Sequence, residues 1–127
     1  MPGTGYTCPP TPPPDLDPDA WAGSIARMRE LGARRWYLTH FGPVDDAADH
    51  LGRLQPNLDA VIEIGMRALD GGAGHDALTG LIHRHMEERL GPVQEGVLTN
   101  LEWATPSYMA ALGLIRLHKQ RARETAP

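Results

Sequence analysis

The sequence predicts a mostly α-helical protein, and three observations lead to this fold class. Apolar side chains recur at the helical period of 3.6 residues over most of the chain after residue 18. Asp-Pro and Thr-Pro pairs stand where two of these periodic stretches begin, and glycines stand where several of them end. Only residues 35–39, Arg-Trp-Tyr-Leu-Thr, have the composition of a β-strand.

The bulk composition indicates one globular domain of ordinary charge. A length of 127 residues suits a single core, and a net charge of −4 offers no basic surface for nucleic acid or for an anionic membrane. No apolar run approaches the roughly 20 residues that span a bilayer, and the first residues lack the features of a signal peptide. The single Cys8 excludes an internal disulfide, which fits a reducing cytoplasm. We therefore expect a cytoplasmic protein without nucleic-acid or membrane partners.

The N-terminal region predicts an extended lead-in followed by a helix. Prolines crowd residues 1–17 and favour extended geometry, so this segment is predicted to be a tether or lead-in. Asp17 is placed to cap a helix whose first residue is Pro18, and Gly32 ends the helix predicted over 18–31. The apolar face of this helix consists of Trp21, Ile25, Met28 and Leu31.

The predicted strand at 35–39 runs into a turn at His40-Phe41-Gly42-Pro43, where glycine and proline interrupt regular structure. No other segment has a convincing strand pattern. A single strand leaves its backbone donors and acceptors unpaired. The sequence therefore predicts one strand with an open edge.

From Asp45 onward the pattern is helical. Pro56 is predicted to bend or divide the first of these helices, glycines at 71–74 break the pattern, and a second helix ends near Gly91. A weaker helical signal covers 93–103. Thr105 and Pro106 repeat the cap-plus-proline start of a last helix, with an apolar stripe of Tyr108, Met109, Leu112 and Ile115. The predicted packing anchors are Trp21, Trp36, Trp103 and Tyr108.

Two stretches resemble a known family. Residues 24–31, Ser-Ile-Ala-Arg-Met-Arg-Glu-Leu, and 36–43, Trp-Tyr-Leu-Thr-His-Phe-Gly-Pro, are similar to the last helix and strand of metallo-β-lactamase-fold hydrolases. The run Ala-Thr-Pro-Ser-Tyr at 104–108 resembles the C-terminal helical extension of the glyoxalase II-like branch. The resemblance covers nearly the whole chain.

The resemblance implies a fold, a metal and a site residue. Residues 1–43 would be the C-terminal helix–strand unit of an αββα metallo-β-lactamase fold, and 44–127 a helical extension that walls the substrate cleft. His40 matches the histidine that the family's strand delivers to the metal, which is zinc by resemblance. The implied activity is metal-dependent hydrolysis of an ester, thioester or lactam-type bond in a small-molecule substrate.

The upstream ligands of that family are absent. A hydrolytic zinc site needs about three protein ligands, and the family's His-x-His-x-Asp-His segment has no counterpart here. His83-Arg84-His85 resembles it superficially, but this segment is predicted to be helical. In a helix, two residues apart corresponds to a rotation of about 200° around the axis, so the two side chains cannot converge on one metal. We therefore expect a fragment, a truncated product or one part of a split protein, inactive alone.

Other interpretations remain open. The chain is alternatively a non-enzymatic helical interaction module that forms a homo-oligomer or pairs with a separate N-terminal half, through its open strand and the Trp21 face. A remnant without function is a third alternative. Ser24 and Ser107 have no evident His and acid partners, so no serine triad is predicted. The histidines expected to be solvent-exposed are His50, His75 and His118, with His83 on a solvated face.

Overall fold

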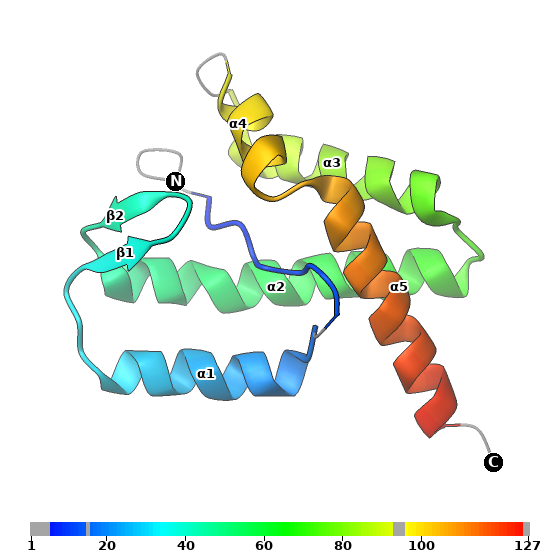
Figure 1. Cartoon of the computed structure of the whole chain (residues 1–127), viewed down its shortest axis with the longest axis horizontal. Coiled ribbons are helices and arrows are strands. Elements are labelled where there is room, and N and C mark those ends of the chain that lie inside the picture. Colours follow the sequence, from blue (N-terminus) through cyan, green and yellow to red (C-terminus); the bar gives the residue numbers. More distant parts are fainter. Residues whose placement is uncertain (1–5, 15, 93–95, 126–127) are drawn as a thin grey trace.

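The computed structural model describes residues 6–14, 16–92 and 96–125, and over these the protein is mostly α-helical, as predicted. Figure 1 shows α1 (Pro18–Glu30), α2 (Ala47–Asp70) and α3 (His75–Leu90) running roughly antiparallel in succession, with a small hairpin at one end and α5 (Ser107–Glu124) crossing α2. The elements are α1 (Pro18–Glu30), β1 (Trp36–Leu38), β2 (Gly42–Val44), α2 (Ala47–Asp70), α3 (His75–Leu90), α4 (Val97–Ala104) and α5 (Ser107–Glu124).

Helix α1 begins and ends where the sequence predicted. The Asp17 carboxylate accepts hydrogen bonds from the backbone N–H groups of Asp19 and Ala20, both at 3.0 Å, and Pro18 occupies the first turn. Gly32 follows the helix with a φ of 60°, a left-handed conformation that favours glycine. Ile25 is buried against α2, and Trp21 and Met28 are half-buried, so this part of the apolar face is covered within the chain, whereas Leu31 is 68% exposed.

The single open strand was a wrong prediction, because the structure has an antiparallel hairpin. Strand β1 pairs with β2 in the register Trp36↔Val44, Tyr37↔Pro43 and Leu38↔Gly42. The glycine and proline that indicated a turn lie inside β2. Each strand of a two-stranded sheet has a free edge, and proline is tolerated at such an edge because its missing N–H removes no ladder bond.

Helix α2 is continuous over 24 residues, so Pro56 does not divide it. Its buried face includes Leu51, Leu54, Leu58 and Val61, at the predicted period. Helix α3 packs beside it, and α5 packs on both. None of the helices in the described ranges is long and apolar enough to cross a membrane.

The start and the buried face of α5 differ from the prediction. Pro106 is the N-cap, and Thr105 instead donates a hydrogen bond from its hydroxyl to the Leu101 carbonyl at 3.1 Å. The face that packs inward is not the predicted stripe, because Tyr108 and Leu112 remain 50% and 41% exposed. The buried residues of α5 are Ser107, Ala111, Gly113, Leu114 and Leu117.

Residues 6–14 form an ordered segment, called the strap below, that crosses α2 between the hairpin and α5 (Figure 1). The predicted tether was therefore wrong: Tyr6 and Thr11 are each only 4% exposed. A side chain on Gly113 would place its Cβ 1.9 Å from the Thr11 carbonyl oxygen. Helix α5 thus needs a glycine at the point where the strap passes.

Two apolar clusters join the N-terminal residues before α1 to the helices. In the larger, Leu16 packs with residues of α2, α3 and α5, and in the smaller, Tyr6 packs with Met86, Leu90 and Leu101. Of the predicted aromatic anchors, Trp21 and Trp36 are half-buried, whereas Trp103 is 83% exposed. The expectation that Trp103 and Tyr108 anchor the core was wrong.

Candidate functional site: a cavity beneath the strap

A half-enclosed cavity of about 330 Å³ lies where the strap meets α3 and the junction of α4 with α5. The strap forms one wall with Tyr6 and residues 8–12. The opposite wall comes from α2, α3 and the α4–α5 junction, and the hairpin turn contributes His40. The lining residues outside the strap are His40, Val61, Ile82, His85, Met86, Ala104, Thr105, Pro106, Ser107, Met109 and Ala110.

The chemistry of the lining is apolar. Among the described residues that line the cavity, none is Asp, Glu, Lys or Arg. Prolines, alanines, two methionines and aliphatic side chains supply most of the wall. Ligand pockets in proteins combine this kind of apolar surface with a few polar groups that orient the ligand. The polar groups here belong to Cys8, His40, His85 and the hydroxyl residues beside them.

His40 lies at the tip of the hairpin, in the turn between β1 and β2. Its side chain is exposed, and its ring makes an edge-to-face contact with Phe41 at a centroid distance of 6.4 Å. His40 also borders the cavity. The residue singled out by sequence resemblance and the helices expected to wall a cleft therefore meet at one cavity.

The residues of the described ranges do not build a zinc site. No group of three or more His, Cys, Asp or Glu side chains within those ranges is placed to hold a metal ion. His40, His85 and Cys8 border the same cavity without gathering into such a group. A hydrolytic zinc ion needs about three protein ligands, so the described part of the chain does not fit the metal by itself.

Cys8 is a neutral thiol in the wall of the cavity. Burial raises the pKa of the Cys8 thiol, and the hydrogen bond with Thr105 only partly opposes that effect. The Cys8 sulfur lies 3.3 Å from the Thr105 hydroxyl oxygen, which itself donates to Leu101. A reactive cysteine needs a lowered pKa. Cys8 thus serves as an uncharged wall residue that ties the strap to the end of α4.

The two histidines of the rejected zinc motif lie in different surroundings. His85 borders the cavity, and burial, with a smaller effect of Arg89, lowers the pKa of its imidazole, so it is neutral at neutral pH. Its Nε2 atom is buried and has no hydrogen-bond partner among the described residues. His83 instead pairs with Glu102, at 2.9 Å from its Nδ1 to the carboxylate. His83 is 42% exposed on the predicted solvated face, but it also has a partner that the sequence did not reveal.

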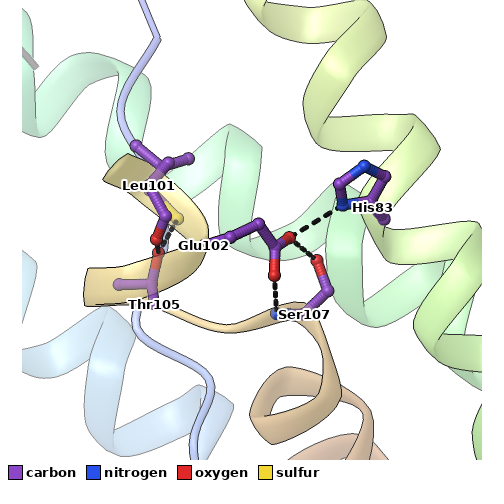
Figure 2. A network of polar contacts seen from close by, with 6 residues as sticks. His83, Leu101, Glu102, Thr105 and Ser107 are labelled. Atoms are coloured by element: carbon purple, nitrogen blue, oxygen red, sulfur yellow. Dashed lines mark hydrogen bonds and ion pairs between the residues drawn. The ribbon is translucent and has the colours of Figure 1, made fainter. Parts of the chain in front are cut away.

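Glu102 joins three helices, as Figure 2 shows. From α4, its carboxylate accepts the backbone N–H of Ser107 at the start of α5, at 3.0 Å, and also the Ser107 hydroxyl. The same carboxylate contacts His83 on α3. Desolvation raises the pKa of Glu102, but the hydrogen bonds from Ser107 and the contact with His83 outweigh it and leave the pKa lowered. Glu102 thereby caps α5, which has no cap from its own N-cap side chain.

Ser107 has an acidic neighbour that sequence reasoning missed, but the arrangement is not a catalytic triad. In a triad the imidazole lies between the hydroxyl and the carboxylate, so that it can take the hydroxyl proton. Here the carboxylate of Glu102 lies between Ser107 and His83. The Ser107 hydroxyl therefore donates to an acceptor that orients it, and this buried residue has a structural role.

The remaining histidines each have a partner and are half-buried rather than fully exposed. Thr7 of the strap lies 3.4 Å from His50, measured between the hydroxyl oxygen and Nδ1, and burial lowers the pKa of His50. The other contacts are His75 with Asp76 at 3.2 Å and His118 with Asp70 at 2.9 Å.

Asn57 is a further residue that sequence reasoning missed. This buried side chain donates from Nδ2 to the Thr7 carbonyl at 2.7 Å and accepts from Arg89 at 3.3 Å. It therefore ties the strap to α2 and α3. A signal was present in the sequence, since Asn57 is a polar residue on the apolar face of α2, between Leu54 and Val61.

Comparison with family models, with curated proteins and with solved structures finds no match to the chain.

Proposed function

We propose that this chain is the substrate-cleft part of a metal-dependent hydrolase of the metallo-β-lactamase superfamily, inactive alone. His40 would be one ligand of a metal whose other ligands come from a separate protein segment. The cavity beneath the strap would hold the substrate. The observation that carries this proposal is that His40 borders the same cavity as α3 and the α4–α5 junction.

Several features support the assignment. A short hairpin holds His40 at a turn, exposed and next to the apolar cavity, so a metal bound there from outside would face the cavity's contents. Active sites place such groups on loops that a rigid scaffold positions. Residues 104–108, which carry part of the resemblance, include four that line the cavity.

Reconstitution tests this proposal. The chain is combined with an N-terminal segment that carries the family's metal-binding motif, and zinc-dependent hydrolysis of an aryl ester and a thioester is measured. Replacing His40 with Ala should lower the rate by about 100-fold or more, since even outer-shell partners of metal sites are worth about 10- to 100-fold. His118→Ala, at the exposed pair with Asp70, is the matched control and should keep full activity. Equal activity of the two variants would remove His40 from the site.

A second candidate function, self-association, is favoured by one observation. Trp103, Tyr108 and Leu112 are near one another in the sequence, and all three expose large apolar side chains. Contiguous exposed apolar surface commonly marks an interface. If the chain associates through these residues, sedimentation equilibrium will show a dimer that Trp103→Ser weakens. Leu31→Ser, an exposed position just after α1, should leave the dimer intact. A monomer at all concentrations would eliminate this candidate.

A further inference from the structure

We infer that the cavity beneath the strap binds an uncharged, ring-bearing apolar molecule about the size of two fused aromatic rings. As a statement about the substrate this rests on the proposed function. Binding itself depends only on the cavity and can be measured on this chain alone.

The volume sets the size of the ligand. An apolar cavity of roughly 150 Å³ holds one benzene ring. The cavity here has about 330 Å³, which is about twice that space. A two-ring molecule fills it, whereas a single ring leaves part of the wall without contacts and so loses dispersion energy.

The walls set the charge of the ligand. None of the described lining residues is Asp, Glu, Lys or Arg. Burial keeps the titratable groups of Cys8 and His85 neutral, and His40, the other histidine of the lining, is an exposed residue of the hairpin turn. Transferring an unpaired charge from water to such a site costs several kcal/mol or more. An anion of the same size as the neutral ligand therefore binds much more weakly.

Two methionines in the cavity wall favour a ligand with an aromatic ring. Met86 lies on α3 and Met109 on α5, and both border the cavity. Thioether groups make favourable contacts with aromatic rings and adapt to the outline of a ligand. The prolines of the strap add rigid apolar surface opposite them. Together these walls suit a flat apolar ring system better than a polar or branched hydrophilic molecule.

The test compares two probes of nearly equal shape, 2-naphthol and 2-naphthoate, at pH 7 with the full chain. Saturable binding of 2-naphthol is expected, with 2-naphthoate weaker by at least about tenfold, which corresponds to 1.4 kcal/mol. Methyl NMR locates the site: the signals of Met86 and Met109 should shift, while that of Met28, whose cluster contributes no residue to the cavity lining, should not. Equal binding of both probes, shifts elsewhere, or no saturation would overturn the inference.

A matched pair of substitutions on α5 gives a second readout. Ala110→Phe fills the cavity and should weaken 2-naphthol binding by about tenfold or more, because a filled site has no room for the ring. Ala122→Phe adds the same side chain at an exposed position of the same helix and should leave binding unchanged. If Ala110→Phe does not fold, the methionine signals still decide the question.

The two proposals fail separately. No metal takes part in the naphthol titration. Binding of 2-naphthol without any reconstituted hydrolysis would remove the proposed function and leave the inference standing. Hydrolysis that depends on His40, without naphthol binding, would overturn the inference and leave the proposed function standing.

Discussion

A single carboxylate, that of Glu102, sets the junction between α3, α4 and α5. It accepts two hydrogen bonds from Ser107 and contacts His83, and these partners lie 5 residues after it and 19 residues before it in the chain. Helix starts expose N–H groups that need an acceptor, and an anion there also interacts favourably with the helix dipole. Because the cavity wall continues from Thr105 to Ser107, this carboxylate also fixes the geometry of the candidate site.

Replacing Glu102 with Gln should destabilise the protein in a pH-dependent way. The pKa of Glu102 is lowered in the folded state, so its contribution is complete above the unfolded pKa of about 4.3 and is lost as pH falls through the folded value. At pH 7 we expect a loss of about 1 kcal/mol in the free energy of unfolding, the usual value of a helix cap. Below about pH 4 the difference from the parent should shrink.

Urea unfolding at a series of pH values measures this effect. Glu63→Gln is the control, because Glu63 pairs with Arg67 on an exposed face of α2 and such surface pairs contribute little. A constant difference between Glu102→Gln and the parent at all pH values would show that the carboxylate charge is not responsible.

At this scale, the hydrogen-bond partners of Glu102 and Asn57 could not be predicted from the sequence. His40 was singled out from a local motif, and the structure places it beside the cavity. The partners of Glu102 and Asn57 come from other helices and from the strap, and no local pattern contains them. Hydrogen-bond partners set by packing become visible only when the fold is known.

At the scale of elements, the residues that cap a helix were predictable from the sequence, but the face of the helix that packs against the rest of the protein was not. The Asp17 cap and the stop at Gly32 follow from backbone requirements within a few residues, and both were predicted. The face of α5 was misassigned because apolar residues occur all around it, and the covered face depends on what packs against it. Gly42 and Pro43 suggested a turn because sequence patterns do not show whether a strand lies at an edge.

The close approach of the strap to α5 at Gly113 gives a prediction at this scale. Gly113→Ala would bring a Cβ to 1.9 Å from the Thr11 carbonyl oxygen, a contact that only movement of the backbone relieves. We expect a loss of about 1–3 kcal/mol in the free energy of unfolding, as for other overpacked sites. The strap should also shift and expose Cys8, the single thiol of the chain, so that it reacts faster with a thiol reagent.

Gly52→Ala is the matched control for this experiment. Gly52 lies in α2, and beyond its own helical backbone nothing lies within 4 Å of the position that a Cβ would take. Alanine there should therefore stabilise the helix by up to about 1 kcal/mol. Thiol reactivity of Cys8 should not change in this variant. If both glycine variants behave alike, the strap does not pass α5 as described.

At the scale of the whole molecule, the N-terminal segments complete the cores of the C-terminal helices. Leu16 packs with Leu58, Leu78 and Leu114, and Tyr6 packs with Met86 and its neighbours. The resemblance placed a boundary after residue 43, a division that stays a prediction. Sequence periodicity identifies apolar faces but not the segment that covers each one, so the role of a proline-rich strap could not be predicted.

This arrangement predicts that residues 44–127 do not form a stable domain alone. Without the first 43 residues the helices lose Tyr6, Leu16 and Ile25 from their cores, all at most 5% exposed in the chain. Burying each such side chain contributes about 1.5–3 kcal/mol, and a whole domain has only about 5–15 kcal/mol of stability. The fragment should keep some helical circular dichroism but lose a cooperative thermal transition.

Point substitutions test the same contribution in the full chain. Leu16→Ala should lower the free energy of unfolding by about 2–5 kcal/mol, whereas Leu31→Ala, at an exposed position, should change it little. A fragment that unfolds cooperatively at the temperature of the full chain would instead make 44–127 an autonomous domain, with the strap a dispensable cover.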